Sequence, residues 1–103
     1  MSKDAELENF VESRLGTYPE VDCFTIAGLV DLLVDVDYTK KEGCKVVKER
    51  PELTNTYLRM FGGYFKSITA KFNKNYETQI KFSGLLGRCM REIKNASMEG
   101  KIK

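Results

Sequence analysis

The chain has 103 residues, which is long enough for one domain and too short for two with separate cores. Apolar residues make up 42% and charged residues 31%, a balance that excludes wholesale disorder. There is no histidine, and the three cysteines are widely spaced, which argues against a zinc site or a disulfide framework. We therefore expect Cys23, Cys44 and Cys89 to be reduced thiols of a cytoplasmic protein.

The net charge of +2 hides a separation of charge along the chain. Residues 1–37 hold nine acidic and two basic residues, a net of −7, whereas residues 38–103 hold six acidic and 15 basic residues, a net of +9. This asymmetry indicates a polyanionic partner for the basic part, an acidic partner, or attraction between two regions of one fold.

Two helices are predicted in the acidic part. The first covers 3–15, with an apolar stripe on one face, and ends at Gly16. A loop over 17–22 follows. The next helix covers 24–36 and is apolar on most sides, although its β-branched residues leave a buried strand as the alternative. At 13 residues this run is shorter than the roughly 20 that a membrane span requires.

The sequence Thr39-Lys-Lys-Glu42 has the pattern of a capping box, which predicts a third helix that ends at Arg50 before Pro51. An apolar helix, a polar turn and a capped, lysine-rich helix form the general arrangement of a helix-turn-helix. The sequence therefore favours a DNA-reading helix over residues 39–50, although the turn is longer than usual and Gly43 lies inside the helix.

Two longer helices are predicted over 54–72 and 77–95, with a turn over 73–75 between them. Their apolar residues recur at intervals of three and four, the heptad spacing of packed helices. These residues are Leu58, Phe61, Phe65, Ile68 and Phe72 in the first helix, and Phe82, Leu86, Cys89 and Ile93 in the second. The sequence thus predicts an all-α, compact single domain of four to five helices over residues 1–95, followed by a frayed basic tail over 96–103.

Gly62 and Gly63 fall inside the predicted helix over 54–72. They indicate either a break or a place where another helix or a phosphate backbone approaches closely. The regular seam on both sides favours a continuous helix with close approach. Gly84 and Gly87 repeat the feature in the next helix, so we expect these two helices to pack through small residues.

The stretch from Leu53 to Arg91 contains one acidic residue, Glu77, and seven basic residues. Basic side chains on a rigid helical face supply the electrostatic part of nucleic-acid binding. A solvated surface would show the same pattern. The candidate contacts with nucleic acid or another partner are Lys40, Lys41, Lys45, Lys48, Arg59, Lys66, Lys74, Lys81, Arg88 and Arg91.

No histidine base, nucleophile elbow, phosphate-binding glycine loop or paired-cysteine motif is present, so we expect neither an enzyme nor a bound metal or cofactor. Asp31, Asp35 and Asp37 lack the spacing of a calcium loop. The leading hypothesis is a small DNA-binding regulator. The alternative is a protein-binding modulator, an inhibitor or adaptor of a larger protein in the manner of phage accessory proteins. No membrane partner is expected, and the heptad seams are compatible with a homodimer.

Overall fold

The computed structural model describes residues 2–16, 25–72 and 76–102, which form four α-helices and two 3-10 helices without a β-strand. The elements are α1 (Ser2–Leu15), α2 (Ile26–Glu49), η1 (Pro51–Leu53), α3 (Thr54–Thr69), η2 (Ala70–Phe72) and α4 (Tyr76–Ile102). The all-α class predicted from the sequence is confirmed. Some predictions concern residues outside the described ones: the loop over 17–22, the thiol of Cys23, and the turn over 73–75 with the candidate contact Lys74.

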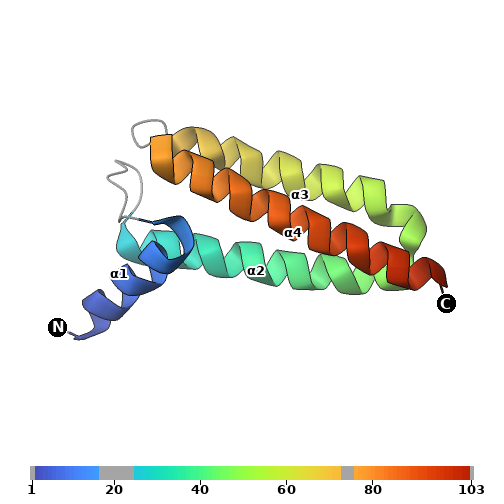
Figure 1. The fold of residues 1–103 in the computed structure, drawn as a ribbon, viewed down its shortest axis with the longest axis horizontal. Coiled ribbons are helices and arrows are strands. Elements are labelled where there is room, and N and C mark those ends of the chain that lie inside the picture. The colour runs from blue at the N-terminus through green and yellow to red at the C-terminus, as the bar shows by residue number, and fades with distance from the viewer. Residues whose placement is uncertain (1, 17–24, 73–75, 103) are drawn as a thin grey trace.

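The three long helices α2, α3 and α4 run side by side, with α4 between the other two in the view of Figure 1. Helix α4 packs against both α2 and α3, whereas α2 and α3 touch each other much less. Helix α1 lies across one end of the bundle and contacts α2 and α4. The Cα atoms span 49 × 28 × 16 Å, so the domain is elongated and flat.

The core follows the predicted apolar seams. Phe61, Phe65 and Phe72 of the α3 seam are buried, while its other two members are half-buried. All four seam residues of α4 are buried. The rings of Phe72 and Phe82 lie 5.3 Å apart between centroids, which joins the two seams at one end of the bundle. Heptad spacing therefore predicted this packing correctly, because α3 and α4 are neighbours over most of their length.

The predicted turn between residues 36 and 39 is absent, because α2 is one continuous helix from Ile26 to Glu49. Its buried residues include Leu29, Leu33, Val36, Gly43 and Val47, which keep one heptad register across the expected turn. No glycine or proline interrupts this segment between residues 29 and 42. Burying one unbroken stripe outweighs the local capping pattern, so the helix-turn-helix prediction is wrong.

Helix α2 begins at Ile26, two residues later than predicted, and the hydroxyl of Thr25 caps it by accepting a hydrogen bond from the amide of Gly28 at 3.0 Å. Helix α1 ends as predicted at Gly16, which adopts a φ of 85° and donates its amide to the carbonyl of Glu12 at 2.8 Å. Both helix boundaries thus follow from local chemistry that the sequence displays.

Helix α3 continues through Gly62 and Gly63, but the predicted close approach lies elsewhere. A Cβ atom on Gly63 would meet no atom within 4 Å, and one on Gly62 would make an ordinary contact of 3.5 Å with the sulfur of Met90. Gly87 also faces open space, and Gly84 has only the end of the Arg88 side chain nearby. The expectation that α3 and α4 pack through these glycines is therefore wrong.

Close approach occurs at Gly43 and Gly100 instead. A Cβ on Gly43 would overlap the ring of Tyr57 on α3, and a Cβ on Gly100 would overlap the backbone of Lys48 on α2. The contact at Gly100 explains why the tail predicted to fray from residue 96 is helical as far as Ile102. Ala96 and Ser97 are buried in the same contact region, so packing stabilises the last turns of α4.

Candidate nucleic-acid interface

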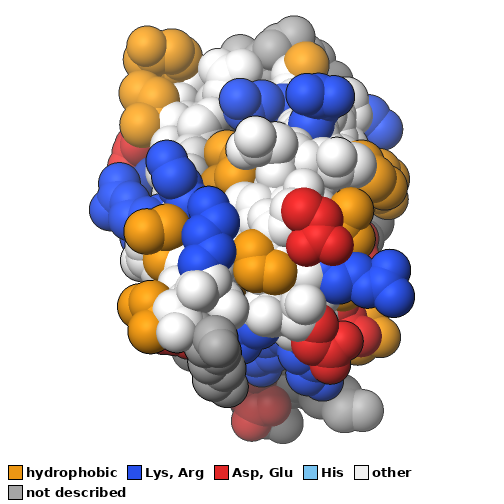
Figure 2. All heavy atoms as spheres, turned by 90° about the vertical axis from the view of Figure 1, so that its right-hand side faces the viewer, with side chains coloured by type: hydrophobic (Ala, Val, Ile, Leu, Met, Phe, Trp, Pro, Cys, Tyr) orange, Lys and Arg blue, Asp and Glu red, His pale blue; other side chains and the backbone are white. Residues whose placement is uncertain are grey.

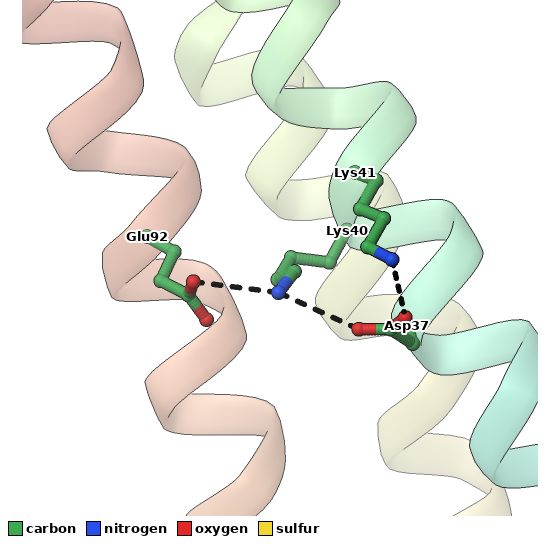
Figure 3. Close-up of polar contacts among 4 residues, drawn as sticks. All are labelled: Asp37, Lys40, Lys41 and Glu92. Atoms are coloured by element: carbon green, nitrogen blue, oxygen red, sulfur yellow. Dashed lines mark hydrogen bonds and ion pairs between the residues drawn. The ribbon is translucent and has the colours of Figure 1, made fainter.

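Two of the predicted DNA-reading lysines, Lys40 and Lys41, are held by carboxylates (Figure 3). Lys40 Nζ lies between Asp37 Oδ1, at 3.5 Å, and Glu92 Oε1 of α4, at 3.3 Å. Lys41 Nζ lies 3.1 Å from Asp37 Oδ2, one helical turn away. Three charged groups of α2 and one of α4 thus form a single network.

The pKa values of Asp37 and Lys40 shift toward the charged forms. The hydrogen bond from Lys41 is the main cause that lowers the pKa of Asp37 below its ordinary value, and the charges of Lys41 and Lys40 add to it. Partial burial opposes the charged form of Lys40, but the hydrogen bond and charge of Glu92, with those of Asp37, raise its pKa. Asp37 and Lys40 therefore stay ionised near neutral pH.

The remaining two predicted readers are paired as well. Lys45 Nζ lies 3.4 Å from Glu42 Oε2 on the same helix, and Lys48 Nζ lies 3.3 Å from Glu99 Oε2 on α4. Exposed pairs of this kind contribute only about 0–1 kcal/mol each. Their consequence for binding is larger, because a lysine that already faces a carboxylate offers a polyanion less net charge.

The basic residues predicted on α3 and α4 differ from those on α2. Arg59, Lys66, Arg88 and Arg91 are exposed, and among the described residues no carboxylate lies within 4.0 Å of their charged groups. Glu92 and Glu99 of α4 pair with Lys40 and Lys48 of α2, so they lie on the α2 side of α4. The outer sides of α3 and α4 are therefore left with unpaired positive charge.

Helical spacing relates several of these cations to the contact between α3 and α4. Gly62 of α3 lies beside Met90 of α4, whose sulfur would be 3.5 Å from a Cβ atom on Gly62. Arg59 and Lys66, three residues before and four after Gly62, lie on the same side of α3. Lys94 lies four residues after Met90 on α4 and is also exposed and unpaired among the described residues. We call Arg59, Lys66, Arg88, Arg91 and Lys94 the α3–α4 basic surface.

Lys94 was missed as a site residue because it lies just beyond the acid-poor stretch from Leu53 to Arg91. Arg14 was missed because it lies in the acidic part of the chain. The structure brings Arg14 of α1 to the same pocket as Lys81 and Arg88 of α4. Only the crossing of α1 over α4 reveals this grouping, and no sequence signal near Arg14 indicates it.

The end of the bundle where α2 passes into α3 has a mixed surface. Basic, acidic and hydrophobic side chains alternate over this end (Figure 2). A pocket of about 430 Å³ there is lined by Glu52 together with Lys94, Lys101 and polar residues. A polyanion would meet a carboxylate at this end, so the sides of α3 and α4 offer the better surface.

An apolar groove lies between α2 and α3, which contact each other less than either contacts α4. Its volume is about 220 Å³, and its lining consists of Thr39, Tyr57, Met60, Phe61, Tyr64 and Phe65. Met60 is 66% and Tyr64 61% exposed. Tyr57 is half-buried and donates its hydroxyl to the carbonyl of Thr39 at 3.0 Å. Burial, followed by the charge of Glu42, raises the pKa of Tyr57, so this hydroxyl stays protonated.

The two described thiols are not poised for chemistry. Cys89 is buried and Cys44 half-buried, and neither forms a disulfide. Burial is the first cause that raises the pKa of each thiol. Within 2–16, 25–72 and 76–102, no group of three or more metal-binding side chains comes together, and no helix is long and apolar enough to cross a membrane.

Comparison of the chain with protein-family models, with curated proteins and with solved structures gives no match. The function therefore has to be argued from the residues themselves. The fold and the surface define a small all-α domain with a rigid helical scaffold and an unpaired basic surface on two of its helices.

Proposed function

We propose that this protein is a small nucleic-acid-binding regulator that holds phosphate groups with the α3–α4 basic surface. One observation carries the proposal. The four lysines of α2 face carboxylates, whereas the cations of α3 and α4 have no acidic partner among the described residues. Unpaired cations on rigid helices can replace the counterions that surround nucleic-acid phosphates.

The continuous α2 changes the kind of binding that we propose. Without a separate second helix there is no reader to insert into the major groove. Contacts with phosphates position a protein on nucleic acid but carry no sequence information by themselves. We therefore propose binding through the backbone, with little preference for base sequence, and DNA as the first candidate.

The test compares two double variants that change the net charge equally. Arg59→Gln with Lys66→Gln removes two cations from the α3–α4 basic surface, and Lys41→Gln with Lys45→Gln removes two paired lysines from α2. Fluorescence anisotropy of labelled duplex and single-stranded DNA near 50 mM salt measures the affinity. The α3 pair should weaken binding by about a hundredfold, roughly tenfold for each lost contact. The α2 pair should have a small effect, and equal weakening by both would refute the surface.

A second candidate function is favoured by the apolar groove between α2 and α3. Exposed Met60 and Tyr64 beside buried aromatic residues form a surface that suits a partner protein. Asp35, one turn before Thr39 on α2, is exposed, and Glu42 lies near Tyr57. These acids on the α2 side favour a basic amphipathic helix as the partner of a protein-binding modulator.

A pull-down with and without nuclease separates the two functions. A protein that remains bound after nuclease, and that is lost with Met60→Ser and Tyr64→Ser, supports the modulator. Co-purification of nucleic acid that survives these two substitutions supports the regulator.

A further inference from the structure

The pocket between α1 and α4 collects three cations. Its volume is about 360 Å³, and it is lined by Ser13 and Arg14 of α1 and by Ile80, Lys81, Gly84 and Arg88 of α4. No acidic side chain is among these residues. Like charges that converge repel one another unless an anion lies between them. The pocket therefore has the composition of an anion site.

Contacts within α1 hold the Arg14 guanidinium in place. Its carbon lies 4.4 Å from the centre of the Phe10 ring, and its Nη1 donates a hydrogen bond to Ser13 Oγ at 3.0 Å. Ser13 in turn donates its hydroxyl to the carbonyl of Phe10 at 2.7 Å. Ser13 is thus a positioning residue, and Arg14 needs little further ordering to bind an anion.

The two cations of α4 are placed by glycines. A Cβ atom on Gly16 would lie 3.0 Å from Lys81 Nζ, so the Lys81 ammonium rests against the C-terminal end of α1. A Cβ on Gly84 would lie 3.8 Å from Arg88 Nη1, so the Arg88 guanidinium lies over Gly84 and on the Lys81 side of its own helix. Both side chains line the pocket.

We propose that this pocket binds one phosphate group of the nucleic-acid backbone. Two guanidinium groups offer planar pairs of N–H donors, and an ammonium adds a point charge, a combination suited to an anion with several oxygens. The proposal rests on the proposed function for the source of the phosphate. It extends the binding surface from α3 and α4 onto α1, whose other described charged side chains are acidic.

The experiment uses Arg14→Gln with Arg50→Gln as its matched control. Arg50 is exposed at the far end of α2, and in the described part of the chain it has no acidic partner. Arg14→Gln should weaken binding to a short DNA duplex near 50 mM salt by about tenfold, as the loss of one phosphate contact requires, and Arg50→Gln should not. Lys81→Gln serves as a second pocket variant in case Arg14→Gln disturbs α1, because Lys81 lines the pocket and lies outside the α3–α4 basic surface.

The side-chain Nε–H NMR signals of Arg14 and Arg88 separate the sources of phosphate. Shifts of both signals with DNA, together with the tenfold loss, support the proposal. If the signals shift with inorganic phosphate and DNA does not bind at all, the proposed function is refuted. The nucleic-acid backbone is then not the source of the phosphate, and the pocket is a site for free phosphate. Binding of DNA that leaves the Arg14 signal and the affinities of Arg14→Gln and Lys81→Gln unchanged would overturn the pocket. It would leave the proposed function standing, because neither residue belongs to the α3–α4 basic surface.

Discussion

Replacing Gly43 by alanine tests whether α2 packs continuously against α3. Gly43 lies inside the segment that was expected to form a separate reader helix, and the structure buries it in α2 against Tyr57. A Cβ there would lie 2.9 Å from Tyr57 Cζ and 3.0 Å from Cδ1, closer than side chains tolerate. The ring cannot move freely, because its hydroxyl donates to the carbonyl of Thr39.

Three effects determine how Gly43→Ala changes the free energy of unfolding: one is stabilising and two are destabilising. Alanine favours a helix interior over glycine by about 1 kcal/mol. Overpacking a core contact costs about 1–3 kcal/mol, and losing the hydrogen bond from Tyr57 would cost about 1 kcal/mol more. The free energy of unfolding should therefore fall by about 1–3 kcal/mol. Gly63→Ala is the matched control, because Gly63 is exposed and faces open space, so the free energy should rise by about 0.5–1 kcal/mol.

Urea unfolding followed by circular dichroism measures both variants. For a domain near this size, each kcal/mol also corresponds to about 4–8 °C in Tm. The two substitutions should change stability in opposite directions. If Gly43→Ala stabilised the protein as much as Gly63→Ala, then α2 and α3 would not meet at Tyr57, and the continuous α2 would be refuted.

Two further predictions concern ionisable groups. Asp37→Asn should lower the free energy of unfolding at pH 7 by less than about 1 kcal/mol. The pKa of Asp37 is lower in the folded state than its ordinary value of 3.8, so the ionised carboxylate stabilises the folded state when the pH is above 3.8. That advantage should vanish as the pH falls through the folded-state pKa, and an undiminished difference in urea unfolding at pH 2 would contradict the pairing with Lys41. In a Cys23→Ser background, Cys89 should react with a thiol reagent at pH 7 more slowly than Cys44, because it is more deeply buried. Faster labelling of Cys89 than of Cys44 in the native protein would contradict its burial.

The helices and their seams could be predicted because they depend on local spacing. Phe82, Leu86, Cys89 and Ile93 are apolar at heptad positions, and any neighbouring helix would bury them. The break in α2 was predicted from an equally local pattern, the capping box at Thr39. That prediction failed because the contacts that keep α2 continuous come from distant residues, including the hydroxyl of Tyr57.

The candidate site was only partly predictable for the same reason. A stretch with a single acidic residue, Glu77, identified Arg59, Lys66, Arg88 and Arg91 as candidate cations. The pairing of Lys40 could not be foreseen, since its partner Glu92 lies 52 residues away in the sequence. The placement of Arg14 beside α4 likewise depends on how α1 crosses the bundle. Long-range packing decides that Lys40 pairs with Glu92 and Lys48 with Glu99, and composition alone does not record these pairs.

The salt dependence of DNA binding tests the central claim most directly. If Arg59, Lys66, Arg88 and Arg91 each contact a phosphate, a plot of log K against log salt concentration should have a slope of about −3.6 for duplex DNA, at 0.9 for each contact. The double variant Arg59→Gln with Lys66→Gln should reduce the magnitude of the slope by about 1.8. A slope that the double variant leaves unchanged, or a wild-type protein that does not bind DNA near 50 mM salt, would contradict the account.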